Sequence, residues 1–298
     1  MIDPDKLLRW PLPPVTQAYT ERDSMLYALG LGVTRSNPAG ASALRYVYEG
    51  TEGGLAALPT MATVLAAGGF WMQDPATGID WRRLLHAEQR LQLHRPLPAA
   101  ATVIGEHSVD AIHDKGADKG ALMLLSRRLY DQASGDLIAT VGSTAFLRGD
   151  GGFGARSDAA PPPHPVPADR APDHVVEHAT RAEQALIYRL SGDLNPLHAD
   201  AAVARSAGFE RPILHGLCSY GIAGFAVLTA LCGNDAARLK RLDLRFASPV
   251  FPGETLVTEI WLTGPGRAAL RMRVPARAEA KRQLVLDHGL AEFEPVAL

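Results

Sequence analysis

The segment YRLSGDLNPLH, which ends at His198, gathers an acid, an amide and an imidazole within six residues: Asp193, Asn195 and His198. Gly192 suits the end of a helix, and Pro196 disfavours helical backbone at the asparagine before it. The sequence therefore predicts a fixed turn. A carboxylate with a nearby histidine is a general acid–base pair, able to activate water and to move protons near neutral pH.

A second stretch, RPILHGLC, follows and ends at Cys218, where an apolar run begins. Backbone N–H groups at the N-terminus of a helix favour negative charge, and Gly216 has no side chain to keep a substrate carbonyl away. The two stretches together predict acid–base chemistry beside a stabilised anionic oxygen. Taken singly, each also fits a structural role: the acid as a cap, the histidine as a hydrogen-bonded core residue, and His215-Gly216 as packing.

The elements that must position these residues form an α+β pattern, with a few helices and an antiparallel meander in each half of the chain. In the second half, helices are expected at Arg181–Leu190, Asp200–Ala207 and Cys218–Leu231. The last of these is apolar almost all round, which is typical of a buried helix. Strands are expected at His174–Thr180, Leu239–Phe246, Thr255–Leu262, Ala268–Val274 and Leu284–Phe293.

The first half is expected to resemble the second in its order of elements. A helix capped by Thr20 is expected to end at Gly30 or Gly32. The Ala/Gly-rich stretch Ala62–Trp71 is expected to be a buried helix or a close-packed crossing. Strands are expected at Leu44–Tyr48, His86–Leu93, Thr102–Ile112, Ala121–Asp131 and Leu137–Leu147.

Proline marks the division between the halves. Six of the twelve residues from Pro161 to Pro172 are proline, which excludes a helix or a central strand and favours a stiff, extended linker. The expected organisation is an N-terminal unit at 1–155, a linker at 156–172 and a C-terminal unit at 173–298. The length of 298 residues suits two units, each large enough for its own core.

Composition excludes several classes of protein. The 30 basic and 32 acidic residues nearly cancel, which argues against a nucleic-acid partner. Two cysteines, Cys218 and Cys232, form neither a disulfide framework nor a CxxC metal motif, and both are expected to be buried thiols. The N-terminus lacks the apolar core of a signal peptide, no apolar run spans a bilayer, and the C-terminus is not a peroxisomal signal. We therefore expect a cytoplasmic protein with no membrane partner.

The two stretches, YRLSGDLNPLHAD and GFERPILHGLCSYG, resemble the hydratase 2 motif of MaoC-like (R)-specific enoyl-CoA hydratases. Further segments, among them LRYVYEG, LPTMATVL, HRPLP and RFASPVFPGETL, resemble the two-domain hydratase 2 unit of peroxisomal multifunctional enzymes, so the likeness covers nearly the whole chain. The resemblance implies a double hotdog fold: two α+β units, each an antiparallel sheet wrapped around a long helix. It also implies an acyl-CoA substrate and a homodimer. The ends differ from those of the peroxisomal proteins, with no dehydrogenase region before the unit and no sterol-carrier region after it, so a free-standing hydratase is expected.

The resemblance assigns site residues one by one. It implies catalytic roles for Asp193, His198, Asn195 and Gly216, and substrate contacts for Glu49, His86, Gln89, His215, Leu217 and Arg245. Whether Glu49 acts chemically or holds structure stays open. HAEQ departs from the usual HGEQ, because Ala87 stands in place of glycine. Arg245 is a candidate for the CoA phosphates, with an exposed strand charge as the alternative.

The expected reaction is reversible hydration of trans-2-enoyl-CoA to (3R)-3-hydroxyacyl-CoA, with the first unit accommodating the acyl chain. No metal or redox cofactor is expected, because hydration changes no oxidation state. Three alternatives use the same features: a dehydratase of 3-hydroxyacyl thioesters on CoA or acyl carrier protein, a hydratase of specialised branched or dicarboxylic substrates, and a non-catalytic acyl-thioester-binding module. A thioesterase would have no need of the Asn-Pro-x-His turn.

Overall fold

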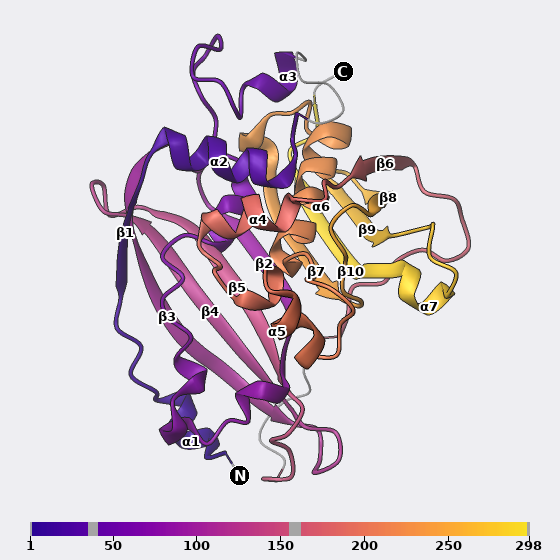
Figure 1. Ribbon diagram of the computed structural model, residues 1–298. Coiled ribbons are helices and arrows are strands. Elements are labelled where there is room, and N and C mark those ends of the chain that lie inside the picture. Colours follow the sequence, from indigo (N-terminus) through magenta and orange to yellow (C-terminus); the bar gives the residue numbers. More distant parts are fainter. Residues whose placement is uncertain (1, 35–40, 155–161, 297–298) are drawn as a thin grey trace.

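The computed structural model describes residues 2–34, 41–154 and 162–296. Its strands form one antiparallel sheet of ten strands in the order β1-β3-β4-β5-β2-β7-β10-β9-β8-β6 (Figure 1). The strands of the first half are β1 (Val15–Tyr19), β2 (Leu84–Leu93), β3 (Ala101–Asp114), β4 (Ala121–Asp131) and β5 (Leu137–Leu147). Those of the second half are β6 (His174–Ala179), β7 (Leu239–Phe246), β8 (Thr255–Gly264), β9 (Arg267–Arg273) and β10 (Leu284–Phe293).

The two halves of the sheet repeat one topology. From the outer edge inward the first half runs β1-β3-β4-β5-β2, and the second runs β6-β8-β9-β10-β7, which is the same order with each number raised by five. They join where β2 pairs antiparallel with β7, with Glu88 opposite Arg245 and Gln92 opposite Arg241. Two units of equal strand order that share one continuous sheet make a double hotdog.

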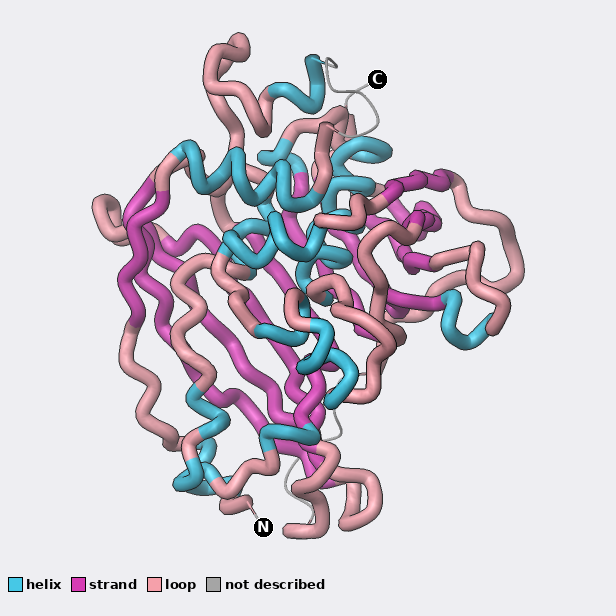
Figure 2. Tube along the Cα trace, viewed as in Figure 1, coloured by secondary structure: helices cyan, strands magenta, loops and turns pink. Residues whose placement is uncertain are grey.

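Helices cover one face of this sheet (Figure 2). The long helix α6 (Gly216–Leu231) packs on the second half, and Cys218, Val227 and Leu228 on it are buried. Two glycines of α6 admit its neighbours: a Cβ on Gly221 would lie 2.7 Å from a methyl of Leu31, and one on Gly224 would overlap Thr60. The helix α2 (Glu21–Leu31) and the 3₁₀ turn η1 (Pro59–Thr63) therefore pack closely on it.

Short elements fill the remaining connections. They are α1 (Pro4–Leu8), α3 (Ala41–Leu44), η2 (Trp71–Gln73), η3 (Pro75–Thr77), η4 (Trp81–Arg83), α4 (Gln184–Tyr188), η5 (Arg189–Ser191), η6 (Pro196–His198), α5 (Ala201–Ser206), η7 (Ala236–Arg238) and α7 (Ala280–Gln283). In the described part of the chain, no helix is long and apolar enough to cross a membrane. Both cysteines are free and buried.

One sequence prediction in the first half is wrong, and the structure decides between the two alternatives of another. Leu44–Tyr48 is not a strand; α3 ends at Leu44 and a turn follows, because Arg45 and Tyr46 both donate to the carbonyl of Asn234 beyond the end of α6. Ala62–Trp71 holds no α-helix: it begins in η1 and continues as an irregular crossing. Its alternative interpretation, a close-packed crossing, describes it.

The proline-rich run lies against the second half as far as it is described. Residues 156–161 of the expected linker fall outside the described residues, and 162–172 form neither helix nor strand. His164 contacts the buried carboxylate of Asp243 at 3.2 Å and accepts from His288 through its carbonyl at 3.0 Å. Arg170 accepts from the indole of Trp261 at 3.0 Å. The run is therefore held by hydrogen bonds along β7, β8 and β10.

Candidate active site

The GDLNPLH turn is held by its own hydrogen bonds. Gly192 ends η5 with φ of 118°, a conformation that favours glycine. Asp193 Oδ1 accepts from the backbone N–H of Asn195 at 3.1 Å, and Asn195 Oδ1 in turn accepts from the N–H of Leu197 at 3.0 Å, which caps η6. The side-chain amide of Asn195 therefore supports the turn, and the backbone N–H of Asn195 orients the carboxylate of Asp193.

His198 is a buried histidine with one free nitrogen directed away from its anchor. Its Nδ1 lies 2.9 Å from the carbonyl oxygen of Ile213, which can only accept, so Nδ1 carries the proton and Nε2 offers a lone pair. Burial lowers the pKa of His198 below its usual value. The imidazole is therefore neutral at neutral pH and its Nε2 can take a proton.

His215 joins the turn to the helix. It is the residue before α6, and its Nε2 donates to the backbone carbonyl of Asp193 at 3.1 Å. Its ring stacks on that of His198, with centroids 3.7 Å apart and planes at 27°. Burial, assisted by His198, lowers the pKa of His215 to about 4, so it stays uncharged. His215 thus positions both members of the expected pair.

Side-chain atoms of Asp193, His198 and His215 lie within 4.8 Å of one another. Two neutral imidazoles and a carboxylate could also hold a transition-metal ion, although the acid–base chemistry of the pair requires none. A water molecule between the carboxylate and His198 Nε2 would meet two groups that can each take a proton from it, and the group that takes the proton can then give it to the substrate. The arrangement is therefore suited to adding water or removing it.

Gly216 is the first residue of α6, where backbone N–H groups have no partner within the helix. A Cβ at this position would lie 3.0 Å from Cε1 of Phe246, so glycine permits the close approach of that ring. Phe246 in turn packs against His86, with ring centroids 4.8 Å apart. Leu217 is partly buried against the core. The N-terminus of α6, the turn of Asp193 and the start of β2 thus lie close together.

The HAEQ segment lies on β2 and contains a β-bulge between His86 and Glu88. The bulge falls at Ala87, which adopts it without a positive φ. Desolvation by the surrounding protein lowers the pKa of His86 to about 4, and the charge of Asp193 acts in the opposite direction. Part of the side chain still faces solvent. Gln89 is buried and donates to the carbonyls of Arg90 and Gly142.

The structure does not bring two of the expected contacts to the turn. Glu49 lies in an exposed turn shortly after Arg45 and Tyr46, which bind Asn234 beyond the C-terminal end of α6. The turn of Asp193 lies at the N-terminal end of this helix, and a helix of 16 residues is about 24 Å long. Arg245 lies on the opposite face of β7 from Phe246 and binds Glu88 through Nε at 2.9 Å. Burial alone would raise the pKa of Glu88, but hydrogen bonding and charge from Arg245 lower it.

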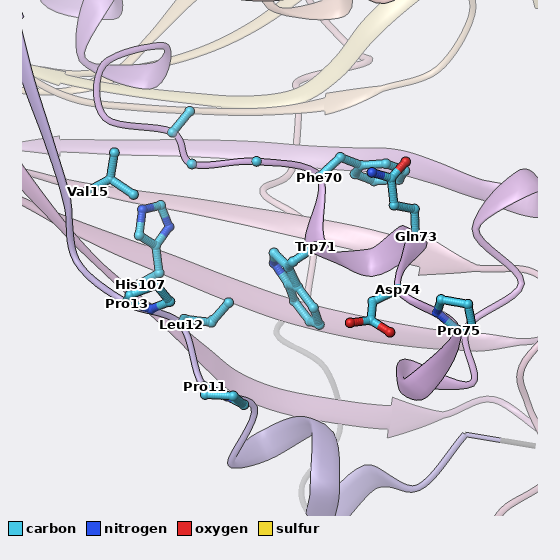
Figure 3. A pocket seen from close by; sticks show the side chains of 13 residues that line it. Pro11, Leu12, Pro13, Val15, Phe70, Trp71, Gln73, Asp74, Pro75 and His107 are labelled. Carbon is cyan, nitrogen blue, oxygen red and sulfur yellow. The ribbon is translucent and has the colours of Figure 1, made fainter.

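A pocket of about 560 Å³ opens on the inner face of the first half (Figure 3). Residues 11–13, 67–71 and 73–75 line it, together with Val15 and His107. Its walls are mainly apolar and aromatic, and its size is within the range of small-molecule sites. Sequence reasoning missed both His107 and its neighbour Arg127. The signal for Arg127 was a charged residue at an inward position of an alternating strand.

Comparisons with known proteins agree with this fold. Residues 17–149 match the model of the MFE-2 hydratase 2 N-terminal domain, and residues 165–281 match that of the MaoC like domain. The repeated strand order defines the class as a double hotdog protein. The chain belongs to the hydratase 2 family of MaoC-like enzymes.

Relatives cover almost the whole chain. "3-hydroxyacyl-thioester dehydratase Y" of Mycobacterium tuberculosis is 43% identical over 94% of each chain. "Enoyl-CoA hydratase 2, peroxisomal" of Arabidopsis thaliana is 38% identical over 95% of this chain and 93% of its own. A crystal structure of a MaoC-like dehydratase from Phytophthora capsici superposes with a TM-score of 0.86, at 35% identity over 98% of this chain and 99% of its own.

Proposed function

We propose that this chain catalyses the reversible hydration of trans-2-enoyl-CoA to (3R)-3-hydroxyacyl-CoA. Relatives named enoyl-CoA hydratase 2 support the hydration of an enoyl-CoA. The observation that carries the mechanism is the grouping of Asp193 and His198 within 4.8 Å at the N-terminus of α6. The (R) configuration is proposed from the family alone.

In this mechanism, water lies between the carboxylate of Asp193 and Nε2 of His198. Both groups start as proton acceptors. One of them takes a proton from the water as the water oxygen bonds to C3, and the pair then delivers a proton to C2, so that H and OH add across the double bond and both groups return to their starting protonation. C3 is electrophilic only while the thioester carbonyl is polarised. The N–H of Gly216 would donate to that oxygen, and a donor of this kind contributes about 3–4 kcal/mol.

We also propose a division of labour. The unit at 173–298 holds the acid–base pair, and the unit at 1–155 accommodates the acyl chain in the pocket beside His107, with 156–172 as the linker. The continuous crossing from Val64 to Trp71 supports this: a Cβ on Gly192 would lie 3.9 Å from the carbonyl of Val64, and residues 67–71 line the pocket. An acyl chain that passes Gly192 and follows the crossing into the pocket would contact its apolar and aromatic side chains.

The second candidate is a dehydratase of 3-hydroxyacyl thioesters, because the relative from M. tuberculosis at 43% identity is named for that activity. The chemistry is the same reaction in reverse, so the site geometry fits both. The two differ in the thioester carrier and in the direction of flux. A homodimer of the double hotdog unit stays a prediction, which sedimentation would test.

The deciding experiment follows the loss of enoyl absorbance with crotonyl-CoA and with longer enoyl-CoA thioesters, and identifies the product by chiral analysis. We expect (3R)-3-hydroxyacyl-CoA and no release of free thiol. The same acyl groups on an acyl carrier protein serve as the comparison. Turnover of the carrier-protein thioester alone would favour the dehydratase, and binding without turnover would leave only an acyl-thioester-binding module.

A further inference from the structure

The crossing that closes over the first half is irregular and strained. Ala66 lies in it with φ of 47°, a conformation that residues other than glycine rarely adopt, and only 1% of it is exposed. Backbone of this kind persists only where the surrounding structure fixes it. Its neighbours should therefore show what holds it.

Three side chains from three strands hold the crossing. Arg127 of β4 donates from Nη2 to the carbonyls of Ala62 at 3.0 Å and Thr63 at 2.9 Å. His107 of β3 donates from Nε2 to the carbonyl of Ala66 at 3.0 Å. Gln17 of β1 accepts from the N–H of Ala66. Both hydrogen-bonding groups of the strained residue are thus bound by the sheet.

Arg127 is an unusual choice for this position. It is 8% exposed, its Nε has no partner, and no carboxylate pairs with it among the described residues. Burial lowers its pKa to about 10. A desolvated cation is costly unless it is hydrogen-bonded, and the carbonyls at the end of η1 are the partners that it has. Its neighbour Arg128, in contrast, is exposed and paired with Glu106.

The crossing has one end at each proposed half of the substrate site. The carbonyl of Val64 faces Gly192 of the catalytic turn, while residues 67–71 form one wall of the pocket. Figure 3 shows the imidazole of His107 beside Val15, with Trp71 across the pocket. A shift of residues 67–71 would therefore change the pocket, whereas the catalytic turn is held by hydrogen bonds of its own.

We propose that Arg127 and His107 are positioning residues that set acyl-chain specificity. They hold residues 62–66 of the crossing against the sheet, and this keeps the pocket beside residues 67–71 open to a long acyl chain. The proposal rests on the proposed function, because it names the part of that site which selects substrates. Neither residue needs to touch the reacting atoms. Loosening the crossing should weaken binding of long chains and leave short ones, which do not reach the pocket, unaffected.

The test measures kcat and KM of the whole chain with crotonyl-CoA and with trans-2-hexadecenoyl-CoA. Arg127→Met removes the charge and the donors but keeps the length of the side chain. We expect kcat/KM for the long substrate to fall about tenfold, mainly through KM, as for a loss of about 1.4 kcal/mol of binding. Crotonyl-CoA should be hydrated as by the wild type. Arg128→Met on the same strand is the matched control and should change neither value.

His107→Phe provides a second variant if Arg127→Met does not fold, since it keeps a ring in the pocket and removes only the donor to Ala66. An equal loss for both substrates, or no loss for either, in a folded variant would overturn the proposal. If the wild type hydrates neither substrate, the proposed function fails instead. The two failures are therefore distinguishable.

Discussion

The two halves of the sheet share one strand order but differ in what covers them. In the second half the segment between β6 and β7 contains α6, whose apolar side chains fill the inner face. In the first half the segment between β1 and β2 follows α2 with short turns, η1 to η4, and leaves a pocket of about 560 Å³. The same sheet can therefore support either a long helix with a polar N-terminus or a cavity.

The difference has a physical consequence for polar groups. The helix in the second half satisfies its own backbone, so its inner face can be apolar. The irregular crossing in the first half cannot, and polar side chains from the sheet, Arg127 and His107 among them, bind its carbonyls. One half thus concentrates polarity at a helix end, while the other buries polarity in its core.

The largest expected effect concerns the pair that only the second half is proposed to supply. Asp193→Asn and His198→Ala should each lower crotonyl-CoA hydration by about 10²–10⁴-fold, because each removes one proton-transfer group. Both variants should still fold; Asp193→Asn should unfold near the wild-type temperature, and His198→Ala at a lower one, because it removes a buried ring. His94→Ala, at an exposed histidine of the first half, is the control and should hydrate at the wild-type rate. Near-normal rates in both site variants would sink the assignment.

The next effect separates packing of α6 from its chemistry. A Cβ on Gly221 would meet Leu31 at 2.7 Å, so Gly221→Ala should destabilise the fold by about 1–3 kcal/mol through overpacking. Denaturant unfolding measures the change. The turn of Asp193 lies at the N-terminus of α6, more than one helical turn before Gly221, so kcat for crotonyl-CoA should be retained. A stable but inactive Gly221→Ala would contradict this separation.

A smaller effect is expected at the start of the same helix. In Gly216→Ala the added Cβ would press on Phe246 at 3.0 Å and shift the N–H that is proposed to bind the thioester oxygen. We expect kcat to fall about tenfold, since a displaced donor loses part of its 3–4 kcal/mol. Combining it with Phe246→Leu should restore part of the rate. If the double variant is no better than the single one, Phe246 is not the cause.

The last effect is a pH dependence of stability, which leaves the activity at neutral pH unchanged. His215 has its pKa lowered to about 4 by burial, whereas a free histidine titrates near 6.5, so the unfolded chain binds more protons between these values. Stability should therefore fall as pH decreases from about 6.5 to 4, by up to about 1.4 kcal/mol per pH unit for this group. In His215→Phe, which keeps the stacked ring, denaturant unfolding should show a shallower slope; an unchanged slope would assign the effect to other groups.

Much of the second half could be predicted from sequence. The expected helix at Cys218–Leu231 lies within α6, because a run that is apolar all round is a strong signal. The turn at Asp193 was predicted from glycine and proline, whose backbone preferences are local. The strands expected at Leu239–Phe246, Thr255–Leu262 and Leu284–Phe293 also match β7, β8 and β10 closely.

The first half was harder for reasons that lie outside any local pattern. Leu44–Tyr48 is rich in residues that favour strands, yet Arg45 and Tyr46 bind Asn234. This tertiary contact cannot be predicted from the residues of the segment itself. β1 follows two prolines, Pro13 and Pro14, and was missed. The partners of Arg127 are backbone carbonyls 64 and 65 positions away, which no spacing rule relates to it.

The two units that meet where β2 pairs with β7 belong to one polypeptide, and this alters how the fold can vary. In a dimer of identical chains, every substitution appears on both sides of the symmetry axis, so a helix exchanged for a cavity would be exchanged twice. Here the axis relates segments with different sequences. Each half is free to mutate alone, and the cavity in one half leaves the helix in the other intact.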